Sequence, residues 1–121
     1  MTKQRQLIYN IVNSTPDHLK VEEIFNEVKK NNSTMVFATV YNSLNYLVEN
    51  GFIRRIRIPG LPDHFDRNLQ PHDHLLCEKC GKLIDVPSQE EKLNFFDERG
   101  NYYLNKQVLY YGVCYLCQKK L

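Results

Sequence analysis

The sequence predicts an α+β chain of 121 residues, in which a helical first half precedes a smaller second half that contains most of the strands. Apolar residues recur with helical periodicity as far as Gly51, and patterns typical of strands follow. All four cysteines lie in the second half. The net charge of +2 comes entirely from residues 1–67, which hold nine Lys and Arg against seven Asp and Glu. We therefore expect one domain over residues 1–67 and another over residues 68–121.

Residues 1–51 predict three short amphipathic helices separated by polar turns. Pro16 ends the first, because a helix cannot readily continue through proline, and Asn50-Gly51 ends the third. Three such helices in so short a stretch make a small bundle. The apolar positions of the three segments are, in order, Leu7, Ile8, Ile11 and Val12, then Val21, Ile24, Phe25 and Val28, then Val40, Tyr41, Leu44, Leu47 and Val48.

After Gly51 the pattern changes to two short strands, over residues 52–58 and 63–67, around a turn that contains Pro and Gly. Three helices followed by a basic hairpin is the order of a winged helix-turn-helix, whose third helix enters the DNA major groove while the hairpin lies along the phosphate backbone. Guanidinium groups suit such contacts because they pair with phosphate at two points. Two alternatives stay open: Val40 and Tyr41 could belong to the core, and the hairpin could be a solvated edge strand whose charges block aggregation. The predicted DNA-contacting residues are Ala38, Thr39, Tyr41, Asn42 and Asn45 on the third helix and Arg54, Arg55 and Arg57 on the hairpin.

The second half has a β-β-α-β pattern. We expect a hairpin of residues 74–77 and 82–86, turned at Cys-Glu-Lys-Cys-Gly. A helix is predicted over residues 88–100, with Ser88 as the N-cap and a glutamate three residues on as its capping-box partner. A long strand is predicted over residues 101–114, which are rich in Tyr, Leu and Val. This α/β unit is small for an independent core, so we expect its tyrosines and leucines to pack against a second copy of the chain.

Two Cys-x-x-Cys pairs predict a metal site. Each tight turn presents two sulfurs, and the folded segment between the pairs can bring them together into the tetrahedral site that zinc prefers. Such a site supplies folding energy that a small core lacks. The alternative is a thioredoxin-like redox pair, which needs a Cys-x-x-Cys that opens a helix after a strand and does not account for the second pair. The four predicted zinc ligands are Cys77, Cys80, Cys114 and Cys117.

His72 and His74 precede the first cysteine pair and predict a second metal site. Residues two apart in a strand point to the same face, so both imidazoles reach one point while Asp73 faces away. Three imidazoles and two carboxylates form a harder donor set than four thiolates and suit Fe²⁺ or Mn²⁺, with zinc a further candidate. The alternative is a pair of partly exposed histidines beside a zinc knuckle. The candidate ligands of this second site are His18, Asp66, His72, His74 and Asp85.

Composition and pattern exclude several classes of protein. No apolar run approaches the roughly 20 residues of a membrane-spanning helix, and the N-terminus lacks the apolar core of a secretory signal. We therefore expect a cytoplasmic protein with no membrane partner, in a compartment that keeps cysteines reduced. An enzyme is not expected, because a thiol oxidoreductase needs reactive thiols and a metallohydrolase needs a general base beyond the metal ligands. A zinc-ribbon interaction module would leave the helix-turn-helix half without a role.

Along nearly its whole length the chain resembles the ferric-uptake-regulator (Fur) family of bacterial metal-dependent repressors. "TKQRQLIYNIV" is similar to the family's Thr-Pro-Gln-Arg helix, "ATVYNSLNYLVENGFI" to its recognition helix, and "PHDHLLCEKCGKLIDV" with "YGVCYLCQ" to its metal region. The resemblance implies a homodimer that binds a palindromic operator in double-stranded DNA, with structural zinc on the four cysteines. It also implies that the five His and Asp residues form a regulatory Fe²⁺ or Mn²⁺ site at the hinge between a DNA-binding and a dimerisation domain. Metal there would hold two winged helices at the spacing of two DNA half-sites, and its loss would let them separate.

One position of the resemblance points to a particular branch of the family. At Asp85 the chain resembles the peroxide-sensing (PerR) members of the family, which have Asp at this position, whereas iron sensors tend to have Glu there. The resemblance then implies that Fe²⁺ reacts with hydrogen peroxide and that the oxidant modifies ligand histidines, for which His18 and His72 are the matching positions. Pro71 and residues 105–106 stand where many iron sensors have further histidines, so one regulatory site is expected. The alternative is an iron- or zinc-responsive regulator that does not sense peroxide.

Overall fold

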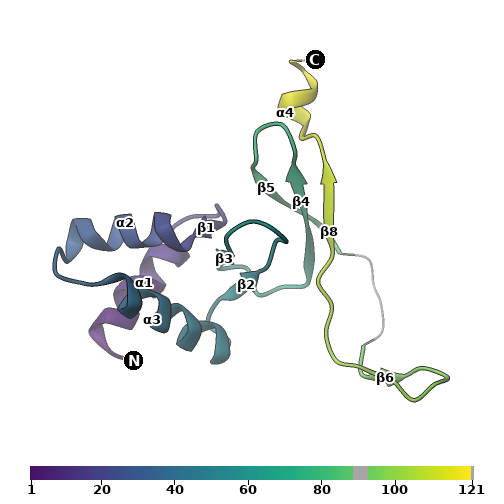
Figure 1. Cartoon of the computed structure of the whole chain (residues 1–121), viewed down its shortest axis with the longest axis horizontal. Helices are drawn as coiled ribbons and strands as arrows, with labels where there is room; N and C mark the ends of the chain where they lie inside the picture. Colours follow the sequence, from purple (N-terminus) through teal and green to yellow (C-terminus); the bar gives the residue numbers. More distant parts are fainter. Residues whose placement is uncertain (89–92, 121) are drawn as a thin grey trace. The chain divides into compact units, whose positions relative to one another are not determined.

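The computed structural model describes residues 1–88 and 93–120 of the chain (Figure 1). The chain divides into two compact units, Met1–Gln70 and Pro71–Leu121. The mixture of helices and sheets confirms the predicted α+β class. Within the described ranges, no helix combines the length and the apolar character needed to cross a membrane.

Helices α1 to α3 pack around one apolar core in the first unit and confirm the three predicted helices. Caps fix where two of them begin: the Thr2 hydroxyl accepts a hydrogen bond at 3.2 Å from the amide three residues later, and the Lys20 amide donates to the Glu23 carboxylate at 3.0 Å. Tyr41 is 43% exposed whereas Val40 is fully buried, so of these two only Val40 belongs to the core. The helices are α1 (Lys3–Asn13), α2 (Val21–Asn31) and α3 (Phe37–Glu49). The central side chains are Ile8, Val12, Ile24, Val28, Val40, Leu44 and Leu47.

A small three-stranded sheet completes the first unit. Its strands β1 (Leu19–Lys20), β2 (Arg54–Ile56) and β3 (His64–Asp66) pair antiparallel in the order β1-β3-β2. Strands β2 and β3 confirm the predicted hairpin, whereas two residues are too few for the sequence pattern to show β1. Phe65 of β3 is 1% exposed and belongs to the helical core, so the hairpin packs against the bundle. Three helices followed by this hairpin form the predicted winged helix-turn-helix.

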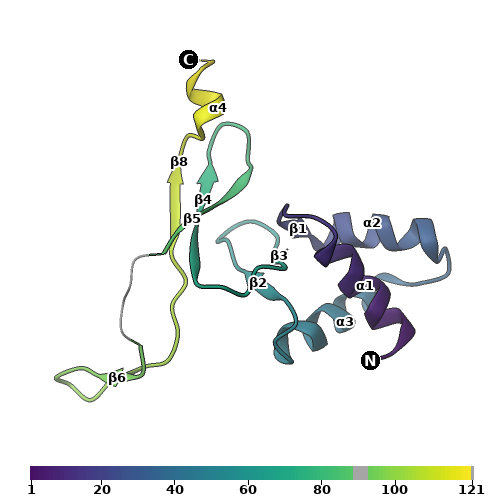
Figure 2. The same cartoon turned by 180° about the vertical axis from the view of Figure 1, so that it is seen from behind.

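The second unit is built on a mixed sheet whose central strand is β4 (His72–Cys77). Strand β5 (Leu83–Pro87) pairs antiparallel with one edge of β4, and β8 (Leu109–Gly112) pairs parallel with the other. Figure 2 shows these three strands from behind. The parallel register places Cys77 opposite Gly112, so the turn after β4 and the turn after β8 lie at the same end of the sheet. Both Cys-x-x-Cys pairs belong to these turns.

The predicted helix over residues 88–100 is wrong where the chain is described. Residues 89–92 lie outside the described residues, and from residue 93 onward the chain forms a hairpin of β6 (Phe95–Phe96) and β7 (Tyr102–Tyr103). Two aromatic pairs join these strands, each with ring centroids 4.6 Å apart, and such cross-strand pairs stabilise a hairpin over a helix. In the turn, hydrogen bonds from Asn101 lower the pKa of the Asp97 carboxyl, whose oxygen accepts the Asn101 amide at 3.0 Å.

The predicted long strand over residues 101–114 is interrupted. Only β7 and β8 are extended and paired, and residues 104–108 connect them without strand pairing. A short helix, α4 (Tyr115–Gln118), follows β8 and is not indicated by the sequence pattern, because four residues make barely one turn. This helix positions the second cysteine pair.

Candidate metal centres

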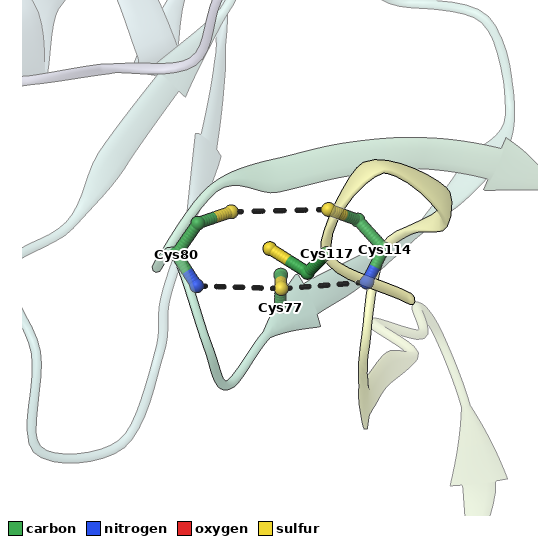
Figure 3. A group of neighbouring side chains, drawn as sticks. All are labelled: Cys77, Cys80, Cys114 and Cys117. Carbon is green, nitrogen blue, oxygen red and sulfur yellow. Dashed lines mark hydrogen bonds between the residues drawn. The ribbon is translucent and has the colours of Figure 1, made fainter. Parts of the chain in front are cut away.

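Four cysteine side chains gather at one end of the sheet in the second unit, with their sulfurs directed toward one another (Figure 3). Cys77 ends β4, Cys80 lies in the following turn, Cys114 is the N-cap of α4 and Cys117 lies within that helix. All four sulfurs lie within 4.8 Å of one another, and those of Cys80 and Cys114 are 3.9 Å apart. Tetrahedral zinc with bonds of about 2.3 Å needs sulfurs about 3.8 Å apart, so this arrangement fits that ion.

Each cysteine pair has its own backbone turn. Gly81 has a left-handed φ of +76°, which lets the chain reverse after Cys80, and its amide donates to the Cys77 carbonyl at 2.8 Å. In the other turn the Gln118 amide donates to the Cys114 carbonyl at 3.0 Å. Because β4 and β8 run parallel, these two local turns present their sulfurs to each other.

The electrostatics of the cluster favour a bound cation. The amides of Cys114 and Cys80 donate to the Cys77 sulfur at 3.3 and 3.4 Å, and these hydrogen bonds lower the pKa of Cys77 to about 6. At Cys117 the hydrogen bond with the Cys114 thiol and burial raise the pKa to about 12. Four thiols this close cannot all ionise without a positive charge among them, since each thiolate repels the next. The cluster therefore fits a metal ion better than it fits four free thiols.

The redox alternative has partial structural support and a clear objection. Cys114 does open a short helix after a strand, as a thioredoxin-like pair requires. Cys77 does not, because a turn and then β5 follow it. The sulfurs of both pairs converge on one point, which a single redox pair does not require. The arrangement thus favours one four-thiolate centre.

In the first unit, His18 and Asp66 form a buried pair. The register of β1 and β3 sets this pair: Leu19 lies opposite Phe65, so the next residues outward on each side, His18 and Asp66, meet. His18 Nε2 lies 3.2 Å from Asp66 Oδ2, and the two side chains are 5% and 2% exposed. The other Asp66 oxygen accepts the Asn68 amide at 2.9 Å, which fixes the orientation of the carboxylate.

In the second unit, His72, His74 and Asp85 form a second cluster on β4 and β5. His74 lies directly opposite Asp85 in the antiparallel register. Nε2 of His72 and Nε2 of His74 lie 3.0 and 3.3 Å from the same Asp85 oxygen, Oδ1. The two imidazole centroids are 4.6 Å apart, so both rings lie on one side of the strand. Asp73, between them, is buried and alternates to the other face.

Both clusters have the chemistry of metal ligands that are positioned in advance. Neutral imidazole offers a nitrogen lone pair in both clusters, and the buried carboxylate of Asp66 needs a compensating positive charge. Nitrogen and oxygen donors of this kind suit Fe²⁺, Mn²⁺ or Zn²⁺, and they are harder than thiolates. The donor set of each unit is therefore chemically distinct from the four thiolates.

The predicted DNA-contacting residues lie on α3 and on the hairpin, and they differ in exposure. Asn45 and Arg55 hydrogen-bond with each other, the Arg55 guanidinium donating to the Asn45 side-chain oxygen. Contact of any of these residues with DNA stays a prediction. The exposed members are Ala38, Tyr41, Asn42 and Arg57, and the half-buried members are Thr39, Asn45, Arg54 and Arg55.

Two polar residues of the hairpin have contacts that the sequence pattern does not indicate. His64, the remaining histidine, is 4% exposed, and its Nδ1 donates to the Pro62 carbonyl at 3.0 Å. Burial lowers the pKa of His64, so this side chain is a neutral part of the hairpin core. Asp63 places Oδ2 3.4 Å from Nε of Arg55. The neutral His64 could have been suspected from its place inside a predicted strand, whereas the partner of Asp63 depends on tertiary contacts.

A sequence profile described as the ferric uptake regulator family matches residues 1–111. The chain belongs to this family. Members of the Fur family are metal-dependent transcription regulators rather than enzymes, which confirms the predicted family and the prediction that the chain is not an enzyme.

Both branches of the Fur family occur among the relatives. The ferric uptake regulation protein of Synechococcus elongatus is 28% identical over 128 residues, covering 100% of this chain and 87% of that protein. The peroxide-responsive repressor PerR of Staphylococcus aureus is 30% identical over 125 residues, covering 99% of this chain and 83% of that protein. Similarity in sequence therefore does not distinguish iron sensing from peroxide sensing.

Two solved structures share the fold of this chain. The Campylobacter jejuni peroxide stress regulator has a TM-score of 0.69 at 28% identity, over 92% of this chain and 85% of that chain. The Helicobacter pylori ferric uptake regulator has a TM-score of 0.75 at 21% identity, over 98% of this chain and 81% of that chain, which supports the fold alone. The winged-helix unit followed by a small α/β unit is thus the architecture of the Fur family.

Proposed function

We propose that this Fur-family chain is a cytoplasmic, homodimeric repressor that binds a palindromic operator and releases it when hydrogen peroxide oxidises the histidines of its regulatory metal site. The observation that supports this most is the pair of preformed ligand clusters, one in each unit. His18 and Asp66 belong to the winged-helix unit, and His72, His74 and Asp85 belong to the other. One ion bound by both clusters would couple the placement of the winged helix to metal occupancy.

Zinc is proposed for the thiolate centre and Fe²⁺ or Mn²⁺ for the regulatory centre. Four thiolates make a closed site, which suits a structural role, and the Cys77 thiol already has a lowered pKa of about 6. The three imidazoles and two carboxylates are harder donors and match the other two ions. When bound there, Fe²⁺ would activate hydrogen peroxide beside the ligand histidines. One peroxide oxygen would pass to an imidazole carbon, which supplies the two electrons, and the other would leave as water.

His18 and His72 are the proposed oxidation targets, because they match the modified positions of the peroxide-sensing branch. His18 and His72 are 5% and 8% exposed, so both are sheltered from oxidants that form in bulk solvent. Asp85 is 42% exposed, which leaves solvent access to the cluster of the second unit past its carboxylate. An oxygen atom added to either imidazole weakens its nitrogen as a donor, so the metal is lost and the constraint on the winged helix is released.

Dimer formation is proposed through the second unit. Many aromatic and leucine side chains of this unit are exposed to an extent that is unusual for a protein surface. Among the described residues, β8 is also an edge strand of its sheet. A second copy of the chain would cover these side chains. Those more than 40% exposed are Phe95, Phe96, Tyr102, Tyr103, Leu104, Tyr110, Tyr111, Tyr115 and Leu116.

The experiment that tests the peroxide proposal is intact mass measurement with peptide mapping of Fe²⁺-loaded, zinc-replete protein. One equivalent of hydrogen peroxide is added under otherwise anaerobic conditions. We expect one added oxygen atom on His18 or His72, together with loss of DNA affinity. Protein loaded with Mn²⁺ serves as the control and should stay unmodified, because Mn²⁺ does not react with peroxide in this way.

Asp85→Glu is the matched variant, because it keeps a carboxylate and changes only its reach. We expect this variant to bind metal and DNA but to resist oxidation. If the wild-type mass is unchanged although iron is bound, the chain is an iron- or zinc-responsive regulator instead. That alternative is supported by the Synechococcus elongatus relative and uses the same ligands.

A further inference from the structure

We infer that Arg55 is a positioning residue that fixes the wing against the recognition helix, rather than a residue that binds phosphate. The wing is here the β2–β3 hairpin, and the recognition helix is α3. This inference rests on the proposed DNA binding for its effect on affinity, but the interactions that support it belong entirely to the first unit. It separates Arg55 from the other two arginines of the hairpin.

Three groups from different parts of the first unit surround the Arg55 guanidinium. It donates a hydrogen bond to the Asn45 side-chain oxygen on α3. Its Nε lies 3.4 Å from Oδ2 of Asp63, the residue just before β3. Its Cζ lies 5.5 Å from the centroid of the Phe65 ring, which is the residue opposite Arg55 in the β2–β3 register. One side chain therefore connects the helix to both sides of the wing.

The location of Arg55 argues against binding to phosphate. Its side chain is only 15% exposed, and the Asp63 carboxylate already compensates its charge. A carboxylate beside a phosphate would also repel DNA. Arg57, by contrast, is exposed and follows β2 on the same segment, so it is the better candidate for the phosphate backbone. Two nearby arginines can thus have different roles.

The chemistry of the side chain explains why an arginine is needed. Guanidinium is a rigid, planar fork of donors with a delocalised charge, so it can donate to Asn45 and form an ion pair with Asp63 while its Cζ lies 5.5 Å from the centroid of the Phe65 ring. An ammonium group is a point charge without this geometry. Lysine at position 55 would keep the charge and lose the positioning, which separates the two roles experimentally.

The test measures DNA affinity of the metal-loaded full chain as a function of salt. The probe is the duplex that the wild-type chain selects from a randomised pool. For Arg55→Gln we expect affinity to fall roughly tenfold with an unchanged slope of log affinity against log salt. Arg57→Gln is the matched reference, and its slope should become shallower by about 0.9 for each phosphate that is no longer neutralised. Arg55→Lys should bind as poorly as Arg55→Gln.

A double-mutant cycle tests the link to the recognition helix. If Arg55 acts through Asn45, the DNA affinity of the double variant, with Asn45→Ala and Arg55→Gln, should be no lower than that of the weaker single variant. Independent binding of the two residues to DNA would instead give additive decreases in affinity. A shallower salt slope for Arg55→Gln, rescue by Arg55→Lys, or additivity would each overturn the inference.

A measurement without DNA separates this inference from the proposed function. Hydrogen exchange of the β2 amides in the full chain should become roughly tenfold faster in Arg55→Gln and Arg55→Lys, and stay unchanged in Arg57→Gln. If the wild-type chain selects no duplex, the proposed function fails while the exchange result still decides the role of Arg55. Equal exchange in all three variants would contradict a positioning role.

Discussion

The thiolate centre and the His–Asp clusters use ligands of different chemistry and different origin in the chain. All four cysteines belong to the second unit, and two local turns on parallel strands bring them together. The His and Asp residues are divided between the units, with two in the first and three in the second. A centre confined to one unit can stabilise that unit alone. Ligands drawn from two units can instead make their arrangement depend on the metal.

The largest expected effect comes from removing zinc from the thiolate centre. Structural zinc supplies on the order of 10 kcal/mol in small zinc-binding domains, and the second unit has few buried apolar side chains. We expect strong chelation, or Cys114→Ser, to abolish protection of the β4 and β8 amides from hydrogen exchange. Amides of α1 to α3 provide the internal control and should stay protected. Equal loss of protection in both units would show that the centre does not act on one unit alone.

A smaller effect is expected from removing only the regulatory metal. Each ligand cluster is already assembled in its own unit, so mild chelation that spares zinc should leave the far-UV circular dichroism unchanged. Affinity for the selected duplex should fall roughly 5- to 150-fold, the range typical of coupling between two binding sites. Loss of helical circular dichroism signal under the same conditions would show that the regulatory metal is needed for folding, as zinc is, and would contradict the difference expected between the two sites.

The smallest effect concerns His64, the histidine that belongs to neither ligand cluster. Burial lowers its pKa below the ordinary value of 6.5, so below that pH the unfolded chain binds a proton that the folded chain does not. The free energy of unfolding should therefore decrease as pH falls from 7 through 6.5, by at most about 1.4 kcal/mol per unit of lowered pKa. The decrease should stop once pH is below the folded pKa.

Urea unfolding of wild type and His64→Gln between pH 7 and pH 5 measures this effect. The variant should lack the His64 part of the pH dependence and should bind Mn²⁺ as the wild type does. A large decrease in Mn²⁺ affinity in His64→Gln, with the fold retained, would assign this histidine to the regulatory centre.

The sequence predicts the chemistry of the sites better than the structure of the second unit. The two Cys-x-x-Cys spacings predict the cysteine cluster, because each pair can present two sulfurs to one ion. Strand alternation predicts that His72 and His74 share a face, and the register of β4 and β5 then adds Asp85. The three helices of the first unit are also predicted directly from the sequence, since each buries one stripe of apolar side chains that recur with helical periodicity.

Several features depend on tertiary interactions that no local pattern shows. Strand β1 has two residues and exists because β3 pairs with it. The segment from residue 93 forms a hairpin, in which Phe95 and Tyr103 stack across the two strands, where the sequence predicted a helix. Arg55 resembles its neighbouring arginines in sequence, and its contacts with Asn45, ten positions earlier, and with Asp63 appear only in the folded chain.

We propose that one regulatory ion takes ligands from both units. The most direct test is Mn²⁺ titration of the zinc-replete full chain, followed by electron paramagnetic resonance, for wild type, His18→Ala and His74→Ala. We predict one tight Mn²⁺ per chain in the wild type and absence of this same ion in both variants. Two separate ions, each absent only when its own unit is changed, would contradict the claim.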